Sequence, residues 1–294
     1  MAKTATMVAD GLYFGEGPRW HDGELWFSDF YDHTVKAMTP DGTLRTALEI
    51  DGQSSGLGWL PDGRLLYVSM LDRRLMRVEV DGPVEHADLS GIATYHCNDM
   101  VVDAAGRAYV GNFGFDLDGE LAARGVESVL AEHVAAKLAR VDPDGSVHVA
   151  AEDMHFPNGS VITPDGRTLI VAETFGLRLT AFTIADDGSL HDRRIWADLG
   201  FRAPDGICLD AEGHVWVANP LAPECMLVAE GAEGGDIIDV VDTGTPCFAC
   251  MLGGDDRSTL YMLTAANSTA EAASASRTGR VMAVDVEVPG AGRP

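Results

Sequence analysis

Carboxylate and carboxamide side chains recur at one position of a repeated sequence pattern, five to seven residues before an Asp that opens a turn. The six residues at this position are Glu16, Ser55, Asn98, Asn158, Asp205 and Phe248. Such side chains supply the oxygen ligands that Ca²⁺, Mg²⁺ or Mn²⁺ prefer, and two facing carboxylates are unfavourable unless a proton or a cation lies between them. The pattern therefore predicts a divalent-cation site, and ordinary turn formation by Asp and Asn is the alternative.

Six copies of one sequence repeat must position these residues. Each copy is an Asp-containing turn followed by an apolar run of β-forming residues. The leading residues of the six copies are Asp22, Asp62, Asp103, Asp165, Asp210 and Asp255. Their intervals of 40, 41, 62, 45 and 45 residues suit a blade of four short antiparallel strands. The sequence thus predicts an all-β fold, a six-bladed β-propeller, as a single domain over residues 1–294. Propeller symmetry would bring the six polar positions together at the top of the central channel.

Two irregularities refine this prediction. The sixth unit contains only three strands before the chain ends, so we expect Thr4–Ala9 to supply its outer strand and close the ring. The long interval contains residues 112–141, where the spacing of Leu121, Val126 and Leu130 fits one face of a short helix. We expect this helical insertion in the third blade to lie over the top face, as decoration of the rim or as a lid.

Composition restricts the classes of partner. Lys and Arg total 21 against 46 Asp and Glu, and the net charge of −25 opposes binding to nucleic acid or to anionic membranes. No signal-peptide pattern or run of 18 apolar residues occurs, so we expect a soluble, cytoplasmic monomer or small homo-oligomer that acts on a small molecule. The five cysteines are odd in number and dispersed, and we interpret them as buried structural thiols. Ala272–Thr278 and Pro289–Pro294 are the segments least expected to be ordered.

One catalytic motif is set aside on its context. Gly52-Gln53-Ser54-Ser55-Gly56 matches the nucleophile elbow of serine hydrolases. That elbow requires a strand before the Ser and a helix after it, whereas here the following apolar run enters the turn at Pro61-Asp62-Gly63. The sequence therefore does not favour Ser54 as a nucleophile.

Six ordered motifs extend over nearly the whole chain. They are Gly15-Glu16-Gly17-Pro18-Arg19-Trp20, Asn98-Asp99-Met100-Val101-Val102-Asp103, Val110-Gly111-Asn112-Phe113-Gly114-Phe115-Asp116, Pro157-Asn158-Gly159-Ser160, Pro204-Asp205-Gly206-Ile207 and Cys250-Met251-Leu252-Gly253-Gly254. Together they resemble the regucalcin/gluconolactonase family, also called senescence marker protein or luciferin-regenerating-enzyme-like. The resemblance implies a six-bladed propeller with one divalent cation, Ca²⁺, Zn²⁺, Mn²⁺ or Mg²⁺, at the channel mouth. It also implies Glu16, Asn158 and Asp205 as the metal ligands and Asn98 as a contact to substrate or water.

The activity that this resemblance implies is metal-dependent hydrolysis of a lactone or a similar cyclic ester. A metal would polarise the carbonyl and activate water, with Asp205 as the base. Family members that bind sugar acids often place an Arg two residues before the substrate-contacting Asn, where this chain has His96. We expect His96 to be a second candidate base or a substrate contact, with a structural role as the alternative.

Apolar residues surround these positions on the predicted top loops, and Phe113, Phe115 and Met154 are the expected substrate contacts. A substrate less hydrophilic than an aldonolactone is therefore expected. Two other hypotheses stay open, because function belongs to the site and not to the fold. One is phosphotriester hydrolysis or other chemistry at the same metal, and the other is a non-catalytic propeller that binds calcium or a ligand.

Overall fold

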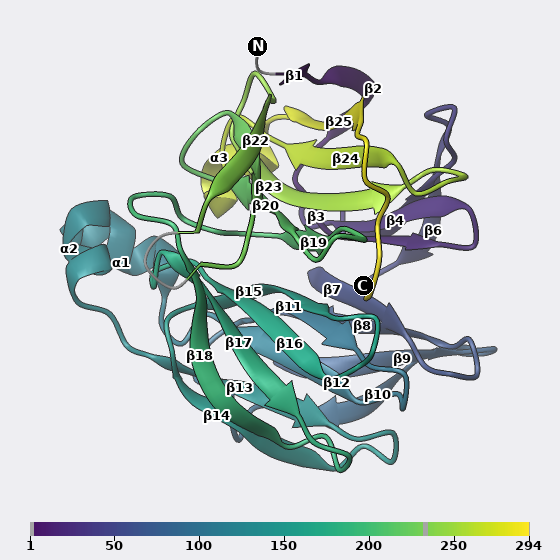
Figure 1. Cartoon of the computed structure of the whole chain (residues 1–294). Coiled ribbons are helices and arrows are strands. Elements are labelled where there is room, and N and C mark those ends of the chain that lie inside the picture. Colours follow the sequence, from purple (N-terminus) through teal and green to yellow (C-terminus); the bar gives the residue numbers. More distant parts are fainter. Residues whose placement is uncertain (1–2, 232–234, 294) are drawn as a thin grey trace.

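The computed structural model describes residues 3–231 and 235–293, which fold into six sheets arranged around a central channel (Figure 1). Blade 1 contains β3 (Gly15–His21), β4 (Glu24–Asp29), β5 (Thr34–Met38) and β6 (Leu44–Glu49). Blade 2 contains β7 (Ser54–Trp59), β8 (Leu65–Ser69), β9 (Arg74–Glu79) and β10 (Gly82–Asp88). Blade 3 contains β11 (Cys97–Val102), β12 (Ala108–Asn112), β13 (Ala136–Val141) and β14 (Val147–Met154). In each of these blades, neighbouring strands are antiparallel and consecutive in sequence.

The remaining three blades repeat this order. Blade 4 contains β15 (Pro157–Ile162), β16 (Thr168–Glu173), β17 (Arg178–Ile184) and β18 (Leu190–Asp198). Blade 5 contains β19 (Ile207–Leu209), β20 (Val215–Asn219), β21 (Glu224–Val228) and β22 (Ile237–Asp242). Blade 6 contains β23 (Cys247–Gly253), β24 (Thr259–Thr264), β25 (Gly279–Asp285) and, from the other end of the chain, β2 (Thr6–Leu12). The predicted six-bladed propeller of four-stranded antiparallel blades is confirmed.

The N-terminal segment closes the ring, but its pairing differs in detail from the expected Thr4–Ala9. The closing strand is β2, which pairs antiparallel with β25. Thr4 belongs instead to β1 (Lys3–Thr4), which pairs parallel with β22 of blade 5. Residues 3–12 therefore join the outer edges of blades 5 and 6.

The repeated Asp residues form tight turns at one end of the channel, which we call the bottom. Asp62 Oδ1 accepts a hydrogen bond from Arg64 N at 3.1 Å, and Asp165 Oδ1 accepts one from Arg167 N at 3.0 Å. The glycine that follows each of these two Asp residues has a positive φ, which an L-residue adopts only at a cost. Because local hydrogen bonds satisfy these turns, each one sets the register of the strand before it.

The innermost strands contact one another in blade order and complete the circle through β23 and β3. All residues of β11, β15 and β23 are buried. Apolar side chains fill the space between adjacent blades, and the largest cluster joins blades 5, 6 and 1. The five cysteines are buried and form no disulfide in the described part of the chain. The core thus holds rigidly the strand ends that carry the polar positions.

The C-terminal tail crosses the bottom of the channel. Arg293 and Ile162 exchange two backbone hydrogen bonds of 2.7 and 2.9 Å, and Ala291 N donates to Leu209 O at 2.9 Å. The expectation that this segment is least ordered is therefore wrong for the described residues 289–293. The other segment expected to lack order also differs, because it overlaps α3 (Ala270–Ala275).

The insertion in blade 3 is helical, as predicted, but it forms two short helices instead of one. They are α1 (Leu117–Arg124) and α2 (Val126–Ala131), and Gly125 with φ of 75° separates them. Asp116 caps α1 by accepting a hydrogen bond from Gly119 N at 3.0 Å. In Figure 1, α1 and α2 lie on the left of the sheets, and α3 lies partly behind β22 in the upper part of the view. No helix in residues 3–231 and 235–293 is long and apolar enough to cross a membrane.

Candidate functional site

Four of the predicted polar residues converge at the top of the channel. Glu16 belongs to β3, Asn98 to β11 and Asn158 to β15, while Asp205 precedes β19. All four line one cavity of about 240 Å³, and none is more than 9% exposed. The blades that carry them are far apart in sequence, so the convergence follows from the circular order of the innermost strands.

Glycines explain how the polar residues approach each other. Gly159 N donates to Asp205 O at 3.3 Å, and Gly206 N donates to Phe248 O at 2.8 Å, so backbone contacts link blades 4, 5 and 6 beside the cavity. A Cβ on Gly159 would lie 2.6 Å from Asp205 O, and a Cβ on Gly206 would lie 2.6 Å from Ala249 Cα. Only glycine permits the backbones of neighbouring blades to approach this closely.

Hydrogen bonds orient the Asn158 amide. Thr174 Oγ1 donates to Pro204 O at 2.8 Å and accepts from Asn158 Nδ2 at 3.2 Å. The same Nδ2 donates to Asp205 Oδ1. These bonds use only the amide nitrogen of Asn158. Its amide oxygen, Oδ1, accepts no hydrogen bond from the part of the chain that the structure describes. Asn98 Oδ1 accepts a long hydrogen bond of 3.4 Å from Ser55 Oγ.

The negative charges of Glu16 and Asp205 are unfavourable in this buried cluster. Burial raises the pKa of Glu16 well above its usual value, and the nearby charges of Asp205 and Asp99 raise it further. Burial also raises the pKa of Asp205 well above its usual value, with Asp99 adding to the effect and the hydrogen bond from Asn158 opposing it. A cation at this point would relieve the repulsion.

The donor set fits a hard divalent cation that retains water ligands. Glu16 and Asp205 offer carboxylate oxygens, and Asn158 and Asn98 offer amide oxygens, whereas no thiolate or imidazole is needed. Residues 3–231 and 235–293 contain no group of three or more His, Cys, Asp and Glu side chains placed to hold a metal. Any cation here must therefore use the amide oxygens as well as the two carboxylates.

A buried ion pair beneath the cluster is a feature that the sequence did not reveal. Arg19 Nη2 lies 2.7 Å from Asp99 Oδ1, and Arg19 Nε donates to Leu57 O at 2.9 Å. Arg19 also donates to Met100 O, so this one side chain joins the inner strands of blades 1, 2 and 3. Asp99 directly follows Asn98, and Arg19 stands three residues after Glu16 in the same quoted motif, which is the signal that could have indicated them. The pair fixes the backbone that presents Asn98.

His96 lines the same cavity, on the loop before β11. Burial lowers its pKa, and the acidic side chains of Asp116 and Asp118 only partly oppose this effect. The imidazole stacks on Tyr95 with ring centroids 4.1 Å apart. At neutral pH His96 is therefore uncharged, and its two ring nitrogens can donate one hydrogen bond and accept another at the cavity wall.

The predicted apolar contacts are only partly at the cavity. Phe113 lines it, but Phe115 packs behind the wall in a cluster with Val129 and Phe156. Met154 differs most from the expectation, because it is fully buried at the end of β14, an outer strand, and does not line the cavity. The sequence missed several apolar residues that do form the wall: Phe14, Phe30, Phe156, Leu117 and Leu221.

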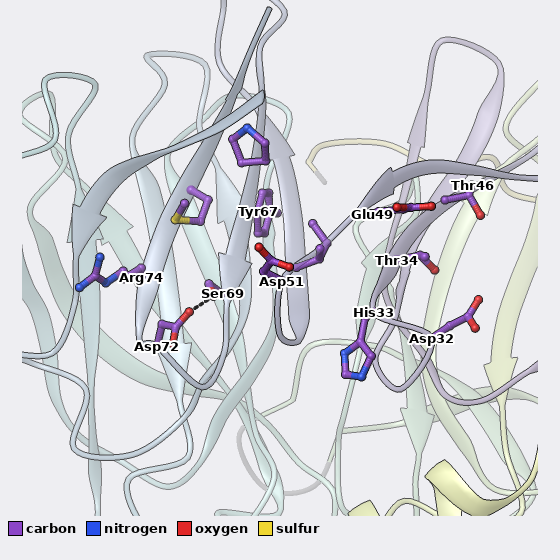
Figure 2. Close-up of a pocket in the computed structure, with 13 residues that line it drawn as sticks. Asp32, His33, Thr34, Thr46, Glu49, Asp51, Tyr67, Ser69, Asp72 and Arg74 are labelled. Atoms are coloured by element: carbon purple, nitrogen blue, oxygen red, sulfur yellow. Dashed lines mark hydrogen bonds between the residues drawn. The ribbon is translucent and has the colours of Figure 1, made fainter. Parts of the chain in front are cut away.

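A second hollow, larger and shallower, lies on the side of the propeller between blades 1 and 2 (Figure 2). It contains none of the predicted site residues. Among its acidic residues, Asp32 pairs with Lys36 and Arg277, and Asp72 accepts a hydrogen bond of 3.0 Å from Ser69, drawn as a dashed line in Figure 2. The channel mouth is therefore the candidate site.

Fold and site together define a six-bladed propeller with a cluster of oxygen ligands at one end of its channel. The chain belongs to the SMP-30/Gluconolactonase/LRE-like family, whose profile matches residues 14–266. It is 26% identical over 270 residues to pentonolactonase XacC of Haloferax volcanii, covering 89% of this chain and 85% of that protein. It is 28% identical over 278 residues to regucalcin of Danio rerio, covering 90% of this chain and 86% of that protein.

The solved structures agree on the fold. The chain is similar to the calcium-binding protein regucalcin from Agrobacterium tumefaciens, with a TM-score of 0.78 and 21% identity, covering 100% of this chain and 97% of that one. The predicted family is confirmed by the profile match over residues 14–266.

Proposed function

We propose that this protein hydrolyses a small-molecule lactone or a similar cyclic ester, with one divalent cation held by Glu16, Asn158 and Asp205. The observation that carries the proposal is the pair of buried, mutually repelling carboxylates at the floor of a cavity that is open to the top face. The lactonase names of relatives that align over most of the chain support the reaction class. The name of the structural neighbour, a calcium-binding protein, supports a bound divalent cation.

The chain's own residues have separate parts in this proposal. A bound cation would polarise the lactone carbonyl and lower the pKa of a water molecule. Asp205 accepts the proton of that water at the carboxylate oxygen that does not bond to Asn158. Asn98 orients the substrate or the water from the adjoining blade. The proton that Asp205 accepts would pass to the departing ring oxygen, and His96, uncharged at neutral pH, would donate a hydrogen bond to the substrate or compete with Asp205 as the base.

The test is a hydrolysis assay on protein stripped of metal with a chelator. A panel of lactones is followed with a pH indicator, before and after addition of Ca²⁺, Mn²⁺, Mg²⁺ or Zn²⁺, and metal binding is measured in parallel by calorimetry. We expect turnover only with metal, together with one bound cation per chain. Faster turnover of a phosphotriester than of every lactone would instead support the phosphotriesterase hypothesis. Bound metal without any turnover would support a non-catalytic propeller.

A further inference from the structure

The cavity above the polar cluster has walls of a different chemical character from its floor. On one side Phe14, Phe30 and Phe248 belong to a single buried cluster, and on the other side Phe156 packs with Phe175. Phe113 packs against both clusters. The cavity therefore lies between two aromatic groups that come from opposite parts of the ring.

These aromatic walls are pre-organised. The ring centroids of Phe113 and Phe156 are 4.6 Å apart, and those of Phe14 and Phe248 are 4.7 Å apart. Such pairs hold each other in position, so a ligand meets a surface that need not rearrange. Rigid apolar surface favours an apolar group on the substrate.

Helix α1 supplies a further apolar surface. Leu117 and Leu121 are one turn apart and both line the cavity, whereas Glu120 and Arg124 form an exposed ion pair. None of the eight residues of α1 is buried. The leucines of an amphipathic helix are thus left partly uncovered beside the polar cluster, and a ligand in the cavity would cover them.

The described lining of the cavity offers no cationic side chain to an acidic sugar. Among the described residues that line it, no Lys or Arg occurs, and the charged residue other than the two floor carboxylates is Asp118. Asp118 Oδ2 already accepts a hydrogen bond of 3.4 Å from Ala270 N. An anionic substituent would therefore face carboxylates alone, and a hydroxyl group seated between the aromatic walls would lose water without gaining a partner from them.

We propose that the lactone this site takes carries one apolar alkyl or aryl substituent, seated between the aromatic walls and the leucines of α1, in place of the hydroxyl groups of a sugar lactone. This inference rests on the proposed lactonase function. The cavity volume of about 240 Å³ corresponds to roughly eight water molecules, so the substituent is short. Burial of each further methylene group is expected to raise kcat/KM about fourfold until the cavity is full.

The experiment compares metal-saturated protein on γ-lactones of increasing alkyl length, from γ-valerolactone to γ-decalactone, with D-glucono-1,5-lactone. We expect kcat/KM to rise along the series and to exceed the value for gluconolactone at least a hundredfold for the best alkyl lactone. Equal or faster hydrolysis of gluconolactone would overturn this inference and leave the lactonase function standing. Absence of turnover on every lactone would overturn both.

A variant separates the apolar wall from general effects on the enzyme. Leu121→Gln is on a helix without buried residues, so the fold should tolerate it. We expect it to lower the ratio of kcat/KM for γ-nonalactone to kcat/KM for gluconolactone at least tenfold. The matched control is Val84→Gln, an exposed apolar residue on the outer strand β10, which should change neither.

Binding without chemistry gives an independent measurement. 2-Pentylcyclopentanone has the shape of an alkyl lactone but cannot be hydrolysed. We expect it to raise the melting temperature of wild-type protein and of Val84→Gln, but to have less effect on Leu121→Gln. An equal shift in all three proteins would show that α1 does not contact the substituent, and would overturn its assignment to this wall.

Discussion

Two aspartates flank the short inner strand β19, Asp205 at the top of the channel and Asp210 at the bottom, and both are buried. Asp210 Oδ1 accepts hydrogen bonds from Glu212 N at 2.9 Å and His214 N at 2.8 Å, both within its own turn. Asp205 accepts its hydrogen bond from a side chain of another blade and faces the charges of Glu16 and Asp99. The same residue type thus stabilises a turn at one end and is left poorly compensated at the other.

The two ends of the channel show the same contrast between local hydrogen bonds and partners from distant segments. Bottom turns are closed by local hydrogen bonds, and the C-terminal tail covers them with further backbone bonds. Top loops differ from blade to blade, and two of them meet where Ala270 N donates to Asp118. Local satisfaction makes the bottom repetitive and stable, while dependence on distant partners leaves the top free to carry chemistry.

The largest effect that would test this comparison comes from a matched pair of substitutions on either side of β19. Asp205→Asn should lower lactone turnover by about 10²–10⁴-fold because it removes the base, and it should abolish the metal-induced rise in melting temperature. In metal-free protein it should raise the melting temperature, because a buried repelling charge is removed. Asp210→Asn should keep the activity and cost about 1 kcal/mol of stability. Similar activity losses in both variants would contradict the comparison.

A smaller effect is expected from glycines at the two ends. Gly159→Ala places a Cβ against the backbone of blade 5 and should destabilise the fold by about 1–3 kcal/mol. Gly166→Ala meets no atom within 4 Å, and its positive φ alone should cost about 1 kcal/mol. Urea unfolding measures both values. Activity at equal folded fraction should fall only for Gly159→Ala, which moves Asp205, and the opposite order would refute the steric argument.

The smallest effect concerns pH and the insertion. His133 Nδ1 lies 3.0 Å from Val129 O in α2, and His133 Nε2 lies 2.9 Å from His155 Nδ1. Burial lowers the pKa of His155; His133, Arg178 and Arg193 lower it further, while Glu173 opposes them. A lowered His pKa means that the stabilisation is complete above the unfolded value near 6.5 and is lost as the pH falls through the folded value.

Hydrogen exchange at pH 7.5 and pH 5.0 measures this effect. After correction for intrinsic rates, amides of residues 126–133 should lose protection worth at most about 1 kcal/mol at the lower pH. The bottom turn at Asp165 is the internal control, because hydrogen bonds from Thr163 and Arg167 lower the pKa of that carboxyl and keep it ionised. His155→Asn should remove the pH dependence. An unchanged dependence in that variant would assign it to other groups.

Much of the architecture could be predicted from the sequence because it depends on local bonds. The turns at Asp62 and Asp165 are satisfied within a few residues, so their spacing revealed the blades without knowledge of the tertiary structure. The same register placed Glu16, Asn158 and Asp205 at one end of the channel. A further regularity was available but unused: five of the six residues that precede the polar positions by two line the cavity, namely Phe14, Gln53, His96, Phe156 and Ala203.

By itself, the sequence determined the position of each residue along the channel axis, between bottom and top. Successive strands run in opposite directions, and the turns fix where each strand starts. It did not determine the distance of a residue from the channel axis. Met154 has the predicted height but ends an outer strand, and Phe115 lies behind the wall that Phe113 forms. The pairing of Arg19 with Asp99, the seating of α1 over the cavity and the path of the tail also depend on contacts between distant segments. Only tertiary packing sets such contacts, and it decided which apolar residues reach the site.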